Sequence, residues 1–397
     1  MTHFQVLIIG GGNAGISTAA QLLRKKKDLQ IAIIEPSDKH YYQPAWTLVG
    51  AGVFDIKKTI RTEASVMPRD VKWIKESAAF FQPEKNSVVT ADGNTYTYEY
   101  LVVAPGIQLN WGEVKGLKET IGKNGATSNY SYLYAPYTYE CLKAIKPGDT
   151  ILFTAPSTPT KCGGAPQKVM YMTADYLRRK GILKDVTLEF VSGGSMLFGV
   201  KKYAASLQQM VDKYGIALHF KNDLISIDGH RKEATFRLMD GLGSVTITKK
   251  YDMIHVTPPQ SAPDFIRKSL LADAKGWIDV NKYTLQHVKY QNIFALGDAT
   301  NTPNAKTGAA VRKQVPVLVN NLVALMEHRS MTDKYSGYGS CPLTVGYGRL
   351  VLAEFGYDNK VMETFPFDQA KPRWSMWLLK KYILPWLYWH KILKGTA

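Results

Sequence analysis

A glycine-rich turn near the start of the chain constrains its fold more than any other feature. The turn, 10–15 (GGGNAG), matches G-x-G-x-x-G and directly follows the apolar run 4–9 (FQVLII). A helix-like segment follows at 16–24, and a second apolar run, 30–34, ends in Glu35. A strand, this turn, a helix and a second strand in that order predict a Rossmann unit that binds a dinucleotide.

Each part of this unit has its own physical role. Gly10 permits the tight turn, Gly12 lets a pyrophosphate approach the backbone, and Gly15 allows the helix to pack closely on the strand. The helix N-terminus offers unpaired N–H groups to the phosphates. Glu35 follows the last glycine at the distance where an acidic side chain accepts hydrogen bonds from a ribose hydroxyl.

Later segments repeat the alternation of strands and helices. Strands are predicted at 100–104, 150–154, 186–191 and 293–296, and a helix at 167–179. This order predicts an α/β fold with parallel sheets and two Rossmann-like dinucleotide-binding domains. We place the first domain at 1–112 and 266–330, the second at 113–265, and a C-terminal region at 331–397.

The turn after 150–154 limits which cofactors the second domain can hold. The stretch 155–164 (APSTPTKCGG) lacks the glycine pattern, and its prolines remove N–H donors that a phosphate needs. The turn after the next strand, 192–196 (SGGSM), lacks the pattern too. We therefore expect one dinucleotide, FAD, and a reductant other than NAD(P)H.

That second turn carries a cysteine in a setting that favours reactivity. Cys162 lies beside Lys161 and shortly before Pro166, the expected first residue of a helix. A cation and a helix N-terminus both favour the thiolate, although a lone cysteine is by default a small buried residue. Cys341 is expected in a second loop and could meet Cys162 as a redox-active disulfide, whereas Cys141 lies in a helix-like stretch and is interpreted as structural.

Composition narrows the classes of partner. The net charge of +17 favours an anionic partner such as lipid head groups, nucleic acid or a charged cofactor. No nucleic-acid-binding signature appears, so nucleic acid is not expected. Three cysteines and eight scattered histidines predict no metal site.

The C-terminal stretch 373–397 differs from the rest in composition. It holds four of the eight tryptophans, interleaved with lysines, and Pro385 is expected to divide it into two short helices. Tryptophans with basic residues favour helices that lie in the head-group layer of a membrane. The alternative is a core or dimer helix. The chain shows no export or transit leader at its start, so we expect a peripheral protein of a bacterial cytoplasmic membrane.

Five segments resemble the type II, mitochondrial-like group of sulfide:quinone oxidoreductases, which are flavoproteins with two dinucleotide-binding domains. They are spread over nearly the whole chain: 40–44 (HYYQP), 161–168 (KCGGAPQK), 255–259 (HVTPP), 297–298 (GD) with 306–307 (KT), and 340–343 (SCPL). The two cysteine segments are the most specific. The third redox cysteine of the type I bacterial enzymes has no counterpart, so the resemblance implies FAD held without a covalent bond.

The resemblance also implies which residues bind FAD. Glu35 would hold the adenosine ribose, Asp298 the ribitol, and the helix that begins near Lys306 would point its N-terminus at the flavin. The full set implied for FAD is Gly10, Gly12, Asn13, Ala14, Gly15, Glu35, Gln43, Ala78, Ala104, Gly106, Asp298 and Lys306.

The reaction that the resemblance implies begins with a Cys162–Cys341 disulfide. Hydrogen sulfide would attack it, Cys341 would keep the sulfur as a persulfide, and Cys162 would leave as a thiolate. A small-molecule acceptor would take the sulfur, and FAD would pass two electrons to a membrane quinone. Tyr347, Phe355 and Trp374 are guesses for the quinone site, and a homodimer is possible.

Three other readings stay open at this point. A type II NADH:quinone oxidoreductase shares the fold, but the missing second glycine pattern argues against it. A flavocytochrome-type sulfide dehydrogenase would be expected to carry an export signal. A flavin-binding membrane protein without turnover would have no use for two loop cysteines.

Overall fold

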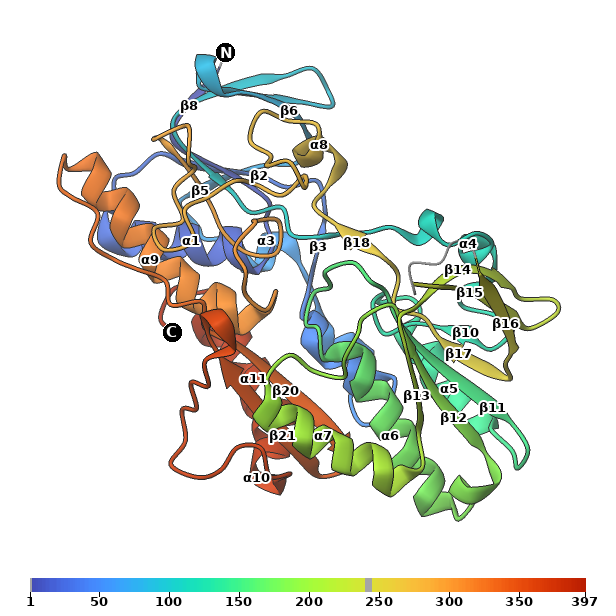
Figure 1. Cartoon of the computed structure of the whole chain (residues 1–397). Coiled ribbons are helices and arrows are strands. Elements are labelled where there is room, and N and C mark those ends of the chain that lie inside the picture. Colours follow the sequence, from blue (N-terminus) through green and yellow to red (C-terminus); the bar gives the residue numbers. More distant parts are fainter. Residues whose placement is uncertain (1, 240–244) are drawn as a thin grey trace.

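The computed structural model describes residues 2–239 and 245–397, and its first sheet is built from the apolar runs of the N-terminal half (Figure 1). The sheet has the strand order β5-β2-β1-β8-β7-β6, with β19 beside β8. The parallel strands are β1 (Thr2–Ile9), β2 (Ile31–Ile34), β5 (Val71–Ile74), β8 (Thr95–Val103) and β19 (Ile293–Ala295), and the antiparallel ones are β6 (Ala78–Gln82) and β7 (Ser87–Thr90).

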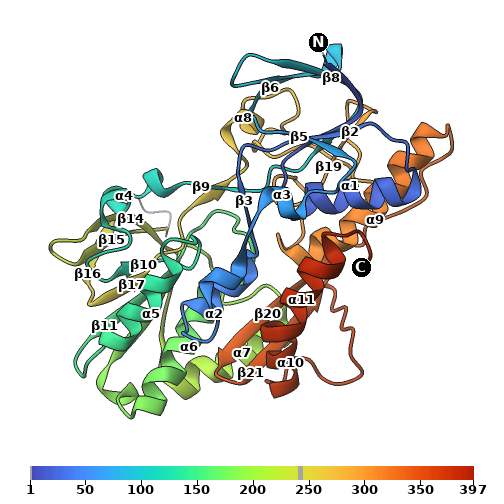
Figure 2. The same ribbon diagram turned by 180° about the vertical axis from the view of Figure 1, so that it is seen from behind.

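Helices cover one face of this sheet and the segment 262–280 packs against the other, which explains why its central strands are apolar along their whole buried length. The long helices α1 (Asn13–Lys25) and α9 (Gly308–Met326) lie side by side against it (Figures 1 and 2). Residues 31–34 are all buried, as expected for a parallel strand covered on both faces. The glycine turn 10–12 thus lies between β1 and α1, as predicted.

A second, fully parallel sheet has the order β10-β17-β11-β12-β13. Its strands are β10 (Ala126–Thr127), β17 (Met253–His255), β11 (Thr150–Ala155), β12 (Thr187–Ser192) and β13 (Ala217–Phe220), and its helices are α5 (Ala135–Ala144), α6 (Ala165–Lys180) and α7 (Lys201–Tyr214). An antiparallel sheet adjoins it: β14 (Asn222–Asp228), β15 (Glu233–Leu238) and β16 (Thr246–Lys250).

Short strands and helices connect the two sheets. A two-stranded link, β9 (Gln108–Leu109) with β18 (Gln260–Ser261), joins the halves, and a ribbon of β3 (Lys39–Tyr41) with β4 (Ile60–Thr62) follows the first Rossmann unit. The remaining short helices are α2 (Trp46–Val49), α3 (Glu63–Val66), α4 (Leu117–Thr120) and α8 (Asp264–Arg267).

The C-terminal region corrects two expectations. Cys341 lies in a strand, not a loop: β20 (Gly339–Gly346) pairs with β21 (Arg349–Phe355) in a hairpin against α6. Pro342 did not prevent this, because proline is tolerated in a strand that has no partner on one side.

The tryptophan-rich stretch forms one helical run, not two helices. α10 (Trp374–Leu378) and α11 (Leu384–Leu387) are joined and followed by π-helical turns at Leu379–Ile383 and Tyr388–Ile392. Pro385 lies in the first turn of α11, where its missing N–H is tolerated within the altered hydrogen-bond register. Among the described residues, we find no helix with both the length and the apolar character needed to span a bilayer.

Candidate active site

The structure brings Cys162 and Cys341 together, although 179 residues separate them in the chain. Their Sγ atoms lie 3.1 Å apart, and both are free thiols. Cys162 is in the loop between β11 and α6, and β20 carries Cys341 along the same helix. Gly164 makes this approach possible, since a Cβ added there would lie 2.7 Å from Cys341 Sγ.

The Cys162 loop is fixed against the segment that precedes α9. Its backbone N–H donates to the carbonyl of Lys306 at 2.7 Å, and its own carbonyl accepts from Ala165. Cys162 has a φ of +54°, a left-handed conformation that a non-glycine residue rarely adopts. Such strain persists only where surrounding contacts impose it. The loop therefore holds the sulfur beside the segment 297–306, which connects β19 to α9.

Buried ammonium groups set the charge of the two sulfurs. Lys168 Nζ donates to Cys162 Sγ at 3.1 Å, and Lys168 and Lys380 are each 4% exposed. The hydrogen bond from Cys341 and the charge of Lys168 hold the pKa of Cys162 well below its usual value. The pKa of Cys341 is raised well above its usual value because its thiol donates to Cys162 and is buried. Cys162 is therefore the thiolate and Cys341 the thiol.

Lys168 keeps its proton in this arrangement, whereas Lys380 is poised to lose it. Burial opposes the charge of Lys168, but attraction to the two sulfurs outweighs burial and raises its pKa. Burial, followed by repulsion from Lys168, lowers the pKa of Lys380 to about 7. Lys380 comes from the C-terminal helical run and donates to the carbonyl of Pro44 at 3.1 Å.

The glycine turn and Glu35 form a cradle that fits a dinucleotide. A Cβ at Gly15 would collide with the carbonyl of Gly10, whereas at Gly12 no atom of the chain lies within 4 Å. The carboxylate of Glu35 accepts hydrogen bonds from the N–H groups of Gly11 and Ser37, each at 2.8 Å. The turn is thus closed where helix meets strand and open where a pyrophosphate would approach.

The remaining residues predicted for FAD lie on segments that adjoin the strands of the first sheet. The N–H of Ala104 donates to the carbonyl of Ile9. Ala78 begins β6 shortly after β5, which pairs with β2, the strand that ends at Ile34 just before Glu35. Gly106 has a positive φ in the turn after β8, and Asn13 and Ala14 open α1.

Asp298 lies near the two lysines that flank the cysteine loop. Burial lowers the pKa of Lys161 and of Lys306 to about 8, and the charge of Asp298 partly offsets this for both. Burial raises the pKa of Asp298. Lys161 Nζ donates to Gln43 Oε1 at 2.5 Å. The structure therefore places Gln43, Asp298 and Lys306 next to the loop that carries Cys162.

Helix α9 begins at Gly308, two residues after Lys306. Its N-cap is Thr307, whose hydroxyl accepts from the N–H of Ala310 at 3.2 Å. The N-terminus of this helix therefore lies beside the cysteine loop. That it points at the flavin stays a prediction.

The three residues guessed for a quinone site do not gather in one place. Tyr347 and Trp374 lie near the turn of the β20–β21 hairpin, where a Cβ on Gly348 would lie 3.4 Å from the Trp374 ring. Phe355 is at the far end of β21 and packs against Phe198. Trp374 is 65% exposed. The sequence contains no signal that shows which of these aromatic residues lie close together in the fold.

Sequence reasoning missed Lys168 and Lys380. Lys168 follows Cys162 by six residues, which places it on the first turn of α6 facing back to the sulfur. That spacing was a usable signal. The sequence carries no signal for Lys380, because its neighbours in sequence include exposed residues and only the tertiary fold buries this lysine.

Comparison with known proteins identifies the family. The chain is 48% identical to the mitochondrial sulfide:quinone oxidoreductase of Dictyostelium discoideum over 98% of its own length and 86% of the relative's. It is 43% identical to the mitochondrial sulfide:quinone oxidoreductase of Mus musculus, covering 99% of this chain and 87% of that one. The chain belongs to the sulfide:quinone oxidoreductase family. The resemblance predicted from the sequence is confirmed.

Two further comparisons agree with the fold of a sulfide:quinone oxidoreductase. The pyridine nucleotide-disulphide oxidoreductase family matches residues 4–134. The crystal structure of the sulfide:quinone oxidoreductase from Aquifex aeolicus superposes with a TM-score of 0.78 at 21% identity, over 98% of this chain and 91% of that one. The predicted α/β fold is confirmed, and membership of the sulfide:quinone oxidoreductase family implies a flavin cofactor, which the cradle fits.

The expectation of a bacterial cytoplasmic membrane is wrong. The sulfide:quinone oxidoreductases of Dictyostelium discoideum and Mus musculus, to which the chain is similar, are mitochondrial proteins and point to the mitochondrion. The expectation rested on the residues at the start of the chain, and these carry no information about the compartment.

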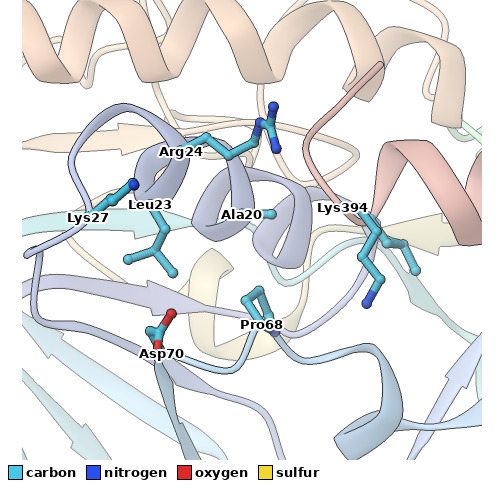
Figure 3. Close-up of a pocket in the computed structure, with 8 residues that line it drawn as sticks. Ala20, Leu23, Arg24, Lys27, Pro68, Asp70 and Lys394 are labelled. Carbon is cyan, nitrogen blue, oxygen red and sulfur yellow. The ribbon is translucent and has the colours of Figure 1, made fainter.

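A surface pocket of about 350 Å³ lies elsewhere, between α1 and the end of the C-terminal helical run (Figure 3). Arg24, Lys27 and Lys394 line it together with apolar side chains such as Leu23. It contains none of the residues predicted for the site.

Proposed function

We propose that this protein oxidises hydrogen sulfide to sulfane sulfur and passes two electrons through FAD to a quinone. The observation that carries the proposal is the pair of thiols 3.1 Å apart, with the buried ammonium of Lys168 on one of them. Two sulfurs this close can form and break a bond with little movement of the chain. Sulfide chemistry needs such a pair, because the attacking anion must displace a thiolate.

The two cysteines have different roles in the reaction. In the oxidised protein they form a disulfide, and hydrosulfide attacks Cys341 Sγ. The new S–S bond leaves a persulfide on Cys341, and the electron pair of the broken bond leaves with Cys162 as a thiolate. Lys168 stabilises that thiolate, and a good leaving group accelerates the attack.

A small nucleophile then removes the outer sulfur from Cys341 and leaves its thiolate. Re-forming the Cys162–Cys341 bond releases two electrons. A bound flavin supplies the two-electron acceptor between these sulfurs and the quinone. The residues expected to hold it are those of the cradle, Asp298, and the N-terminus of α9. The third cysteine, Cys141, lies in α5 with its pKa raised to about 11 by burial, which supports binding without a covalent link.

A membrane-facing surface on the C-terminal helical run would give access to a lipid-soluble quinone. Trp374, Tyr382, Ile383 and Trp386 are each more than half exposed, whereas Trp377 and Trp389 are buried. Below this surface, an apolar cluster that includes Leu48, Met172, Leu350, Met376 and Trp377 lies between α2, α6, the hairpin and α10. We assign quinone entry to this region.

Vesicle flotation tests the membrane surface. The double variant Trp374→Ala/Trp386→Ala should lose most of its binding to vesicles, by roughly tenfold, because two interfacial indole rings are removed. The matched control Trp111→Ala changes an indole distant in the chain and should float like the wild type. Equal flotation of both variants would contradict the assignment.

An anaerobic titration of the yellow protein tests the electron donor. Sulfide should bleach the flavin absorbance, whereas NADH should leave it unchanged, because the turn 155–164 lacks the glycine pattern that a second pyrophosphate requires. Bleaching by NADH and not by sulfide would favour an NADH:quinone oxidoreductase and exclude the function proposed above.

A further inference from the structure

A buried chain of hydrogen bonds joins the segment that follows the first Rossmann unit to the C-terminal helical run. Glu63 Oε2 lies 3.2 Å from His40 Nδ1, and His40 Nε2 lies 2.6 Å from the hydroxyl of Tyr388. The three residues are 1%, 3% and 7% exposed. They come from α3, β3 and the last π-helical turn, so the chain spans 348 residues of sequence between His40 and Tyr388.

The direction of the hydrogen bonds follows from the carboxylate. A carboxylate oxygen can only accept, so the hydrogen bond between His40 and Glu63 requires a proton on Nδ1 of His40. Burial raises the pKa of Tyr388 well above its usual value, so its hydroxyl keeps a proton that it can donate to His40 Nε2. His40 therefore donates to Glu63, and only one oxygen of that carboxylate is satisfied.

The other oxygen of Glu63 faces the flavin cradle without a partner. Oε1 is buried and has no hydrogen-bond donor among the described residues. It lies beside Gly11, where an added Cβ would come within 2.5 Å of it and within 2.6 Å of Glu35 Cγ. A buried carboxylate oxygen without a donor is unfavourable, and the cradle is where a dinucleotide would bring hydroxyl groups.

The C-terminal run packs around the same chain of residues. The rings of Tyr42 and Tyr388 lie 4.8 Å apart, and the Arg61 guanidinium lies 4.4 Å above the ring of Trp389. Trp389 also contacts His40 edge to face. The ribbon of β3 and β4 is therefore the surface on which this end of the chain docks.

We propose that Glu63 links the flavin cradle to the C-terminal helical run, so that flavin binding and docking of the run stabilise each other. A hydroxyl of bound FAD would satisfy Oε1, and the docked run satisfies Oε2 through His40 and Tyr388. Each event lowers the cost of burying the same carboxylate. Such coupling is reciprocal: if docking strengthens flavin binding, flavin strengthens docking by the same factor.

This coupling would make membrane binding depend on whether the protein holds flavin. The exposed aromatic residues Trp374, Tyr382 and Trp386 lie on the same helical run as Tyr388. Flavin-loaded protein would present them as an ordered surface, and protein without flavin would present them on a loosened segment. The inference rests only on the flavin-binding part of the proposed function.

The variant Tyr388→Phe tests the coupling, because it removes one hydroxyl and keeps the packed ring. We expect its dissociation constant for FAD to rise at least about fivefold. The matched control Tyr382→Phe loses a hydroxyl from the same run at a site that is 57% exposed, and it should bind FAD like the wild type. Equal FAD affinity in Tyr388→Phe and the wild type would overturn the proposal.

Hydrogen exchange supplies a second measurement that needs no variant. In wild-type protein, adding FAD should slow exchange of the amides in 374–392 by about the factor measured for affinity, and Tyr388→Phe should lose most of that protection. If FAD leaves exchange in 374–392 unchanged in the wild type, the coupling is absent, whatever the variant does. Neither measurement uses sulfide or quinone, so a failure of the proposed reaction would leave both results interpretable.

Discussion

Cys162→Ser and Cys341→Ser should each lower the rate of sulfide-dependent flavin reduction by at least about 1000-fold, since each removes one of two groups that act as a unit. The structure gives the reason. The two Sγ atoms lie 3.1 Å apart, and serine in either position cannot form the disulfide that hydrosulfide must attack. Anaerobic stopped-flow absorbance of the flavin measures the rate directly.

The third cysteine is the control for this pair. Cys141→Ser changes a partly buried thiol in α5, and its rate should stay within about twofold of the wild type. All three variants should retain the flavin, which its visible spectrum reports. Sulfide-dependent reduction at a near wild-type rate in both Cys162→Ser and Cys341→Ser would remove the cysteines from the chemistry.

The parts of the fold that were predictable from the sequence depend on local patterns. The tight turn at 10–15 requires glycine for its backbone geometry, so the sequence shows it directly. The apolar runs around this turn predict β1, α1 and β2. The position of Cys162 before α6 was predictable for the same reason, because Pro166 marks a helix start. These elements position the cradle and one of the two sulfurs.

The other features of the site depend on distant contacts that no local pattern encodes. Gly339 and Pro342, which surround Cys341, predict a loop, yet pairing with β21 makes the segment a strand. Pro385 predicts an interruption between two helices, yet π-helical turns keep the run helical. From the sequence, Lys380 is interpreted as one more basic residue of a membrane-facing stretch. Only the packing of the C-terminal helical run shows that it is buried near the sulfurs.

Lys168→Met should slow sulfide-dependent flavin reduction by about 10- to 100-fold, because the Cys162 thiolate becomes a poorer leaving group when its ammonium partner is removed. Lys168 Nζ lies 3.1 Å from Cys162 Sγ and is one of the groups that lower the pKa of that thiol. The variant therefore raises the pKa of Cys162. The thiolate of the reduced protein should form at higher pH than in the wild type, which ultraviolet absorbance follows with Cys162→Ser as the blank.

The sign of this pH shift separates an electrostatic role for Lys168 from a purely structural one. Lys202→Met is the matched control, since Lys202 pairs with Glu363 on the surface at 2.8 Å and has no sulfur partner. Its thiolate titration and its rate should match the wild type. Lys168→Arg keeps the charge and should retain a low Cys162 pKa even where its larger head slows the reaction. If Lys168→Met lost activity with an unchanged thiolate titration, packing and not charge would explain the loss, and the lysine would not set the leaving-group character of Cys162.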